Sequence, residues 1–150
     1  MQLTLEKVLV LKKVPLFSGV PETVLSEIIA ACEETAALMG SDIVREGEMW
    51  SDMYIILHGQ VRLHKQGKTV AERASFDEFG ELSALDPAPA EVTVTALEDT
   101  TMFKLPGAAL YRLMNEHKAL ERGIVSSLSR RVREMRAERF AELLQQKTEG

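Results

Sequence analysis

The sequence that decides the fold is Phe79-Gly80-Glu81-Leu82-Ser83-Ala84-Leu85, followed after Asp86-Pro87-Ala88 by Pro89-Ala90-Glu91-Val92-Thr93-Val94-Thr95-Ala96. The first half predicts a short helix that starts at Gly80-Glu81, because an acidic side chain is favourable at the positive end of the helix dipole. The backbone amides at such a helix start also form a ready site for an anion. The second half is rich in β-branched residues and predicts a strand over residues 92–97.

Around this stretch, residues 36–105 alternate apolar and polar side chains with a period close to two, which is typical of β-strands. The predicted strands are bounded by turns that contain glycine or acidic residues. They cover residues 53–57, 61–64, 69–72, 92–97 and 101–105, with turns at 58–60, 66–68 and 98–99. Several short strands joined in this way indicate a barrel or a double-sheet roll.

Both ends of the chain have helical periodicity instead. An apolar segment over residues 5–14 ends at Pro15, and Pro21 suits the first turn of a second helix. The residues of that helix that recur at helical spacing, and should face the core, are Val24, Leu25, Ile28, Ile29 and Cys32. After Pro106-Gly107 the helical period returns and continues to about Lys147. The predicted order is therefore helices, strands, then helices.

Size and composition are those of a single soluble domain. The chain has 150 residues, of which 45% are hydrophobic and 27% charged. No apolar run is long enough to span a bilayer, and the N-terminus has no signal-peptide pattern. The single cysteine, Cys32, cannot form an internal disulfide, which fits a reducing compartment. We therefore expect a cytoplasmic protein without membrane insertion.

The net charge of −5 is unevenly distributed along the chain. Residues 119–147 contain seven basic and four acidic side chains, so this segment carries +3 and the remainder carries −8. A basic helix can meet nucleic acid, but a solvated helix of mixed charge explains the same pattern more simply. Because no helix-turn-helix or other nucleic-acid reader follows, we expect no direct contact with nucleic acid.

Taken in order, the motifs resemble the cyclic nucleotide-binding domain family over residues 10–145. Ile43-Val44-Arg45-Glu46-Gly47-Glu48, Met53-Tyr54-Ile55-Ile56 and Gly59-Gln60-Val61 precede Phe79-Gly80-Glu81 at the spacing of that family. The resemblance implies one domain, 1–150, of the α+β, mainly β class: an eight-stranded, jelly-roll-like double-sheet β-roll. Short N-terminal helices would occupy residues 10–34, the β-roll 35–106 with a phosphate-binding cassette at 79–96, and the C-terminal helices, one of them long, 107–147.

The resemblance also implies a site for a cyclic nucleotide, cAMP or cGMP, and no other cofactor. In the family the cassette glycine lets the backbone approach the phosphate, and the glutamate accepts a hydrogen bond from the ribose 2′-hydroxyl; Gly80 and Glu81 match these two residues. The implied ligand-binding residues are Phe79, Gly80, Glu81, Leu82, Ser83, Ala90, Glu91, Thr93 and Val94, joined by Arg131 and Met135 of the C-terminal helix.

The cassette departs from the family where an arginine usually holds the cyclic phosphate. That position is Ala90, no arginine occurs between Arg73 and Arg112, and the acidic Glu91 follows. Losing one charge-assisted partner costs on the order of 1.5–3 kcal/mol, to which a facing carboxylate adds repulsion. We therefore predict an affinity for cAMP or cGMP at least about a hundredfold weaker than usual. The open alternative is a replacement arginine, either Arg131 or Arg73.

The C-terminal helix carries an apolar stripe, Val125, Leu128, Val132 and Met135, with the spacing of a coiled-coil seam. Bacterial members of the family often dimerise through the corresponding helix, so the resemblance implies a homodimer or a partner protein bound there. The alternative is that the stripe packs on the chain's own β-roll. Both remain open at the level of sequence.

No pattern in the chain indicates catalysis or a metal site. The histidines His58, His64 and His117 have no metal-ligand spacing with one another or with Cys32, and no nucleophile or Walker-type motif is present. We therefore expect a non-catalytic regulatory module with weak or lost cyclic nucleotide binding, used for dimerisation or partner docking. The alternatives are a genuine cAMP sensor with a replacement arginine, and a transcription regulator truncated before its DNA-binding unit.

Overall fold

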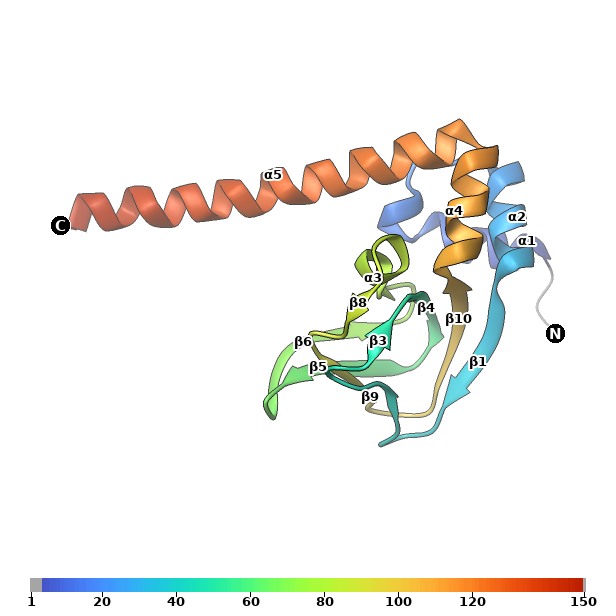
Figure 1. Ribbon diagram of the computed structural model, residues 1–150, viewed down its shortest axis with the longest axis horizontal. Helices are drawn as coiled ribbons and strands as arrows, with labels where there is room; N and C mark the ends of the chain where they lie inside the picture. Colours follow the sequence, from blue (N-terminus) through green and yellow to red (C-terminus); the bar gives the residue numbers. More distant parts are fainter. Residues whose placement is uncertain (1–3, 150) are drawn as a thin grey trace.

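Two four-stranded antiparallel sheets form the body of the molecule, and helices gather at one end of it (Figure 1). The computed structural model describes residues 4–149, so the domain limits predicted at residues 1 and 150 lie outside the described range. The helices are α1 (Thr4–Lys12), the 3-10 helix η1 (Pro15–Phe17), α2 (Glu22–Ala31), α3 (Glu81–Leu85), α4 (Gly107–Glu116) and α5 (Lys118–Glu149). The strands are β1 (Glu33–Ala37), β2 (Asp42–Val44), β3 (Met49–Trp50), β4 (Asp52–His58), β5 (Gln60–Lys65), β6 (Lys68–Ala74), β7 (Glu78–Phe79), β8 (Ala88–Pro89), β9 (Thr93–Ala96) and β10 (Thr100–Pro106).

The order of strands is β1-β10-β4-β7 in one sheet and β2-β9-β5-β6 in the other, while β3 and β8 form a two-stranded ribbon. Eight strands in two sheets confirm the predicted double-sheet roll, and the short ribbon adds the remaining two. In the first sheet Leu105 lies opposite Met53 and Phe103 opposite Ile55. All four side chains are buried and share one apolar cluster with residues of the helices, so the period of two places them on the face of the sheet that packs against the helices.

The core is divided into two apolar clusters. The larger one lies between the helices and the first sheet and includes Leu25 and Ile28 of α2, as predicted. Cys32 packs at its edge, where burial raises the pKa of the thiol to about 12, so the thiol stays protonated and unreactive. The smaller cluster lies inside the roll and includes Trp50, Phe79 and Ala90.

The turn between β4 and β5 requires glycine. Gly59 has a φ of +116°, which L side chains rarely adopt, and a Cβ there would lie 2.7 Å from the Cα of Thr100. The sequence motif around Gly59 is therefore explained by close approach of two strands as well as by turn geometry.

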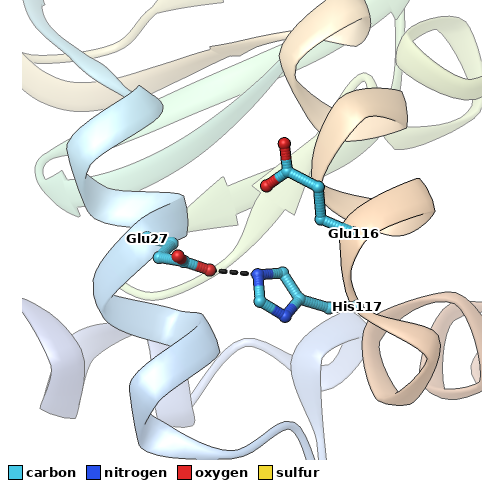
Figure 2. Close-up of side chains that lie close together, drawn as sticks. All are labelled: Glu27, Glu116 and His117. Atoms are coloured by element: carbon cyan, nitrogen blue, oxygen red, sulfur yellow. Dashed lines mark ion pairs between the residues drawn. The ribbon is translucent and has the colours of Figure 1, made fainter.

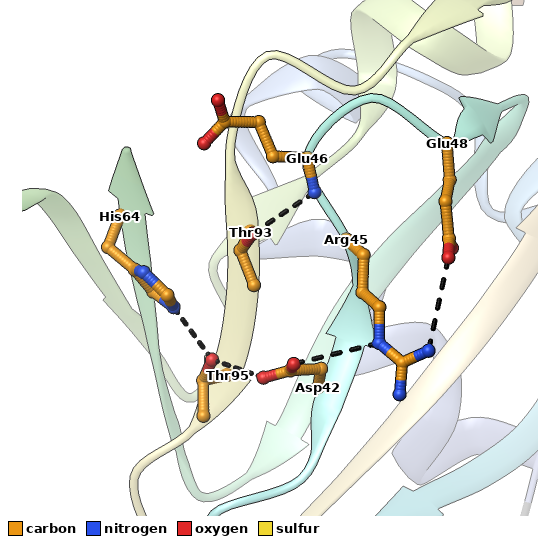
Figure 3. A network of polar contacts seen from close by, with 7 residues as sticks. All are labelled: Asp42, Arg45, Glu46, Glu48, His64, Thr93 and Thr95. Atoms are coloured by element: carbon orange, nitrogen blue, oxygen red, sulfur yellow. Dashed lines mark hydrogen bonds and ion pairs between the residues drawn. The ribbon is translucent and has the colours of Figure 1, made fainter. Parts of the chain in front are cut away.

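Polar contacts tie the strands of the second sheet together on its outer side (Figure 3). His64 of β5 and Asp42 of β2 both hydrogen-bond to the hydroxyl of Thr95 on β9, at 2.8 and 2.7 Å. Because Thr95 donates its proton to the Asp42 carboxylate, the Nε2 of His64 is the donor to Thr95. These hydrogen bonds have a structural role, since they join three neighbouring strands.

At the helical end, an ion pair links Glu27 of α2 to the Nε2 of His117, the residue between α4 and α5 (Figure 2). Possible ligand atoms of Glu27, Glu116 and His117 lie within 4.8 Å of one another. Helix packing brings Glu27 of α2 to the consecutive residues Glu116 and His117, which is why sequence spacing gave no sign of the group. The contact fixes the start of α5 against α2.

Helix α5 changes character along its length. Leu120 and Ile124 are buried against the other helices, whereas the second half of the helix extends well beyond the β-roll (Figure 1). Along its first half, α5 contacts η1 and α4. Within residues 4–149, no helix is both long and apolar enough to cross a membrane.

Candidate functional site

The predicted cassette folds as a strand, a left-handed glycine and a short helix. Glu78 and Phe79 form β7, Gly80 has a φ of +84°, and Glu81 begins α3. A Cβ on Gly80 would lie 2.5 Å from the carbonyl oxygen of Asp52 and closer still to the ring of Trp50. Glycine is therefore required both by the backbone conformation and by the close approach of β3 and β4.

A cavity of about 640 Å³ opens in front of this cassette. Six of the predicted ligand-binding residues line it: Phe79, Gly80, Glu81, Leu82, Ser83 and Glu91. Leu128 of α5 also contributes to its wall. The structure therefore brings the two halves of the cassette and the long helix to one concave site.

The other predicted ligand-binding residues lie outside this lining. Ala90 is 4% exposed and belongs to the apolar cluster inside the roll. Its N–H donates to the carbonyl of Glu48 and its carbonyl accepts from the N–H of Gly47, each at 2.8 Å. Val94 is fully buried, and the hydroxyl of Thr93 accepts a hydrogen bond from the N–H of Glu46. Position 90 is thus buried between Pro89 and Glu91, two residues that do line the cavity.

Arg131 of α5 does not line the cavity but binds two carboxylates that do. Its Nη1 donates to Glu81 at 2.8 Å, and its Nη2 forms an ion pair with Glu78. The side chain of Glu78 is only 6% exposed, and this burial raises the pKa of the carboxyl group although Arg131 offsets part of the effect. The predicted replacement arginine is therefore engaged in holding α5 against the cassette.

The charges that line the cavity are predominantly negative. Four carboxylates, those of Glu78, Glu81, Asp86 and Glu91, face one guanidinium among the described lining residues, that of Arg73. Arg73 donates a hydrogen bond to the carbonyl of its neighbour Glu72 at 3.0 Å. Glu91 is exposed, and within residues 4–149 no ion pair or hydrogen bond engages its carboxylate. Its charge is available to any ligand in the cavity.

The predicted apolar stripe on α5 is divided between two environments. Leu128 packs against the chain's own core. Val125, Val132 and Met135 have exposed fractions of 57%, 47% and 68%. Met135 does not line the cavity, and Val125, Val132 and Met135 are not covered by the β-roll.

Trp50 and Glu78 are among the cavity residues that the sequence reasoning missed. Trp50 lies on the two-residue strand β3 with its ring against Gly80, and Glu78 precedes the cassette on β7. The available signals were a single tryptophan placed directly before the β4 strand, and an acidic residue next to Phe79 in a segment expected to be buried. Neither signal has a pattern that identifies a site without the fold.

We expect the Arg131→Ala variant to be less stable by about 1–3 kcal/mol at neutral pH, because Glu78 would keep its burial and lose its cation. One-third exposure of Arg131 places the value in the lower part of that range. A raised carboxyl pKa lowers stability as pH rises through it, so the loss should shrink as pH falls from neutral, because a lower pH favours the uncharged form of Glu78.

Urea unfolding of Arg131→Ala and of the exposed control Arg130→Ala, each from neutral pH to about pH 5, measures this effect. The control should match the parent protein at every pH. A pH-independent loss in Arg131→Ala would contradict a role for the buried Glu78.

Known proteins with similar sequences and structures share the β-roll architecture and belong to the family that the motifs resemble. The model of the cyclic nucleotide-binding domain matches residues 36–117, more than half of the chain. The Pycsar effector protein XpPycTIR of Xanthomonas perforans is 30% identical over 108 residues, which cover 71% of this chain and 36% of that protein. This chain thus spans only about a third of that relative.

Two solved structures have the same fold. The N-terminal domain of a transcriptional regulator from Streptomyces coelicolor A3(2) is 25% identical, with a TM-score of 0.80 over 86% of this chain and 94% of that one. The regulatory domain of Toxoplasma gondii PKA, crystallised with cAMP, is 25% identical, with a TM-score of 0.69 over 73% of this chain and 44% of that one. The β-roll, the cassette and the family match agree: the chain belongs to the cyclic nucleotide-binding domain family.

Proposed function

We propose that this chain is a non-catalytic regulatory module that binds cAMP and cGMP weakly or not at all and acts through α5. The observation that carries this proposal is the charge of the cavity. The position that would hold a cyclic phosphate is the buried Ala90, and the next residue, Glu91, presents a free carboxylate. A cytoplasmic location, expected from the single unreactive Cys32, is part of the proposal.

The network around Arg131 supports a role for α5 in signalling. Glu78 and Glu81 belong to the cassette, whereas Arg131 belongs to the long helix. Any ligand that hydrogen-bonds to Glu81 must therefore compete with Arg131 for its carboxylate. The position of α5 would then depend on the occupancy of the cavity. This coupling needs no cyclic phosphate.

Isothermal titration of the full chain with cAMP and with cGMP tests the proposal. We expect no binding or a dissociation constant near about 1 mM. Micromolar binding would contradict it. The variants Arg73→Ala and Arg131→Ala would then identify which arginine replaces the missing one.

The second candidate function, a cyclic nucleotide sensor with a replacement arginine, is favoured by one observation. Arg73 lines the cavity and also an adjoining hollow of about 280 Å³, and within the described chain its guanidinium bonds only to a backbone carbonyl. A truncated transcription regulator is the third candidate, because the Streptomyces domain covers nearly the same length. A longer natural product with a DNA-binding unit would support that interpretation.

We further propose that α5 binds a second copy of the chain, or a partner protein, through Val125, Val132 and Met135. In a dimer formed in this way, Val132→Glu would bury a charge and weaken association by about 3 kcal/mol or more, at least about a hundredfold. Light scattering should then give a monomer of 16.7 kDa in place of the dimer. Ala137→Glu, on a different face of the same helix, is the control and should leave the dimer intact.

A monomeric parent protein at about 0.1 mM would exclude the homodimer and leave partner docking. An unchanged dimer in folded Val132→Glu would place the interface elsewhere. Circular dichroism of each variant separates these outcomes from loss of the fold.

A further inference from the structure

Two buried polar atoms at the cavity have no hydrogen-bond partner within residues 4–149. They are the indole Nε1 of Trp50 and the Oε2 of Glu78, a donor and an acceptor. Both residues line the cavity and are more than nine-tenths buried. Unsatisfied buried groups of this kind are rare in folded proteins, because each loses its bonds to water. A ligand that both accepts and donates hydrogen bonds would satisfy them.

The charge of the lining restricts the ligand further. Glu81, Asp86 and Glu91 add three carboxylates to that of Glu78. Arg131 offsets part of this charge, because it pairs with Glu78 and Glu81, and Arg73 is the guanidinium among the described lining residues, so the balance at the cavity remains negative. An anion would be repelled, whereas hydroxyl and amino groups can donate to these carboxylate oxygens. The cavity is therefore suited to an uncharged ligand rich in hydrogen-bond donors.

The remaining wall is apolar and the cavity is large. Leu63, Leu82, Val92 and Leu128 provide surface against which a flat ring can pack. A volume of about 640 Å³ lies in the ordinary range for sites that take small organic molecules. Ring nitrogens can accept from the indole of Trp50, and sugar hydroxyls can donate to the carboxylates.

We infer that the cavity binds an uncharged nucleoside in preference to a cyclic nucleotide; this inference rests on the proposed function, since it assigns a ligand class to the same regulatory site. A nucleoside combines the flat ring, the hydroxyl donors and the ring acceptors that the lining requires. It carries no phosphate to meet Glu91. Its hydroxyls would compete with Arg131 for Glu81, which links occupancy to α5.

Titration of the full chain with adenosine, guanosine, cAMP and cGMP tests this inference. We expect at least one nucleoside to bind at least about tenfold more tightly than its cyclic nucleotide. Glu81→Gln should weaken nucleoside binding about tenfold or more, because a charged acceptor is lost. The control Glu98→Gln, in the turn before β10 and outside the cavity lining, should leave it unchanged.

The outcomes separate the inference from the proposed function. Tighter binding of cAMP or cGMP in the micromolar range would overturn both. No binding of any of the four compounds at about 1 mM would overturn the nucleoside inference alone and leave the regulatory module with weak or lost cyclic nucleotide binding in place. Nucleoside binding that survives Glu81→Gln unchanged, in a folded variant, would place the ligand outside this cavity and overturn the inference.

Discussion

The double variant Ala90→Arg with Glu91→Ala is expected to bind cAMP at least about a hundredfold more tightly than the parent chain. The change supplies one charge-assisted partner for a phosphate and removes one repelling carboxylate, which together amount to about 3 kcal/mol or more. Isothermal titration of both proteins with cAMP measures the gain. The affinity for adenosine should change far less, because adenosine has no phosphate.

The new arginine must extend into the cavity from a buried position between two lining residues, Pro89 and Glu91. Ala90 belongs to the same buried apolar cluster as Trp50, so a larger side chain has to displace part of that cluster to reach the cavity. Ala36→Arg with Glu98→Ala is a matched control, since it makes the same change in net charge outside the cavity lining. An equal gain in the control would reveal a general electrostatic effect. No gain in a folded double variant would contradict the prediction.

Gly80→Ala should lower the free energy of unfolding by about 2–5 kcal/mol. The backbone of Gly80 is left-handed, which costs an L residue about 1–2 kcal/mol, and a Cβ would also overlap Asp52 and Trp50. Gly67→Ala is the matched control, because Gly67 has a similar φ of +80° and a Cβ there would have no atom within 4 Å. The control should therefore lose only the conformational part.

Urea unfolding of the two glycine variants separates the cost of the left-handed backbone from the cost of steric overlap at the new Cβ. A difference of about 2 kcal/mol or more between them is expected, since only Gly80→Ala forces Trp50 and the backbone of β4 apart. Equal losses would mean that the cassette adjusts to the extra carbon. In that case the close approach of Trp50 to Gly80 would not determine the shape of the cavity.

The fold could be predicted from the sequence because its signals are local. The strands from β4 to β6, together with β9 and β10, follow the predicted period of two within one or two residues. Gly59 and Gly80 mark positions where only glycine fits, and such positions are recognisable from their motifs. The helix after Pro21 also begins and packs as expected.

The site could be predicted only in part, because its decisive contacts join distant segments. Glu81 and Arg131 are 50 residues apart in sequence, and no periodicity reveals that they meet. Trp50 is near the cassette only because β3 and β4 pass beside Gly80. The division of the apolar stripe, with Leu128 covered and Val125 exposed, likewise depends on where α5 leaves the core.

Because α5 is long, a small change in its tilt at Arg131 would produce a large displacement at its C-terminal end. From Arg131 to Glu149 the helix is about 27 Å long, at about 1.5 Å per residue. If release of Arg131 let this segment tilt by about 10°, its far end would move by about 5 Å, by simple rigid-rod geometry. A change in hydrogen bonding at the cassette would thereby displace the end of α5 by a distance large enough to alter its contacts with another protein.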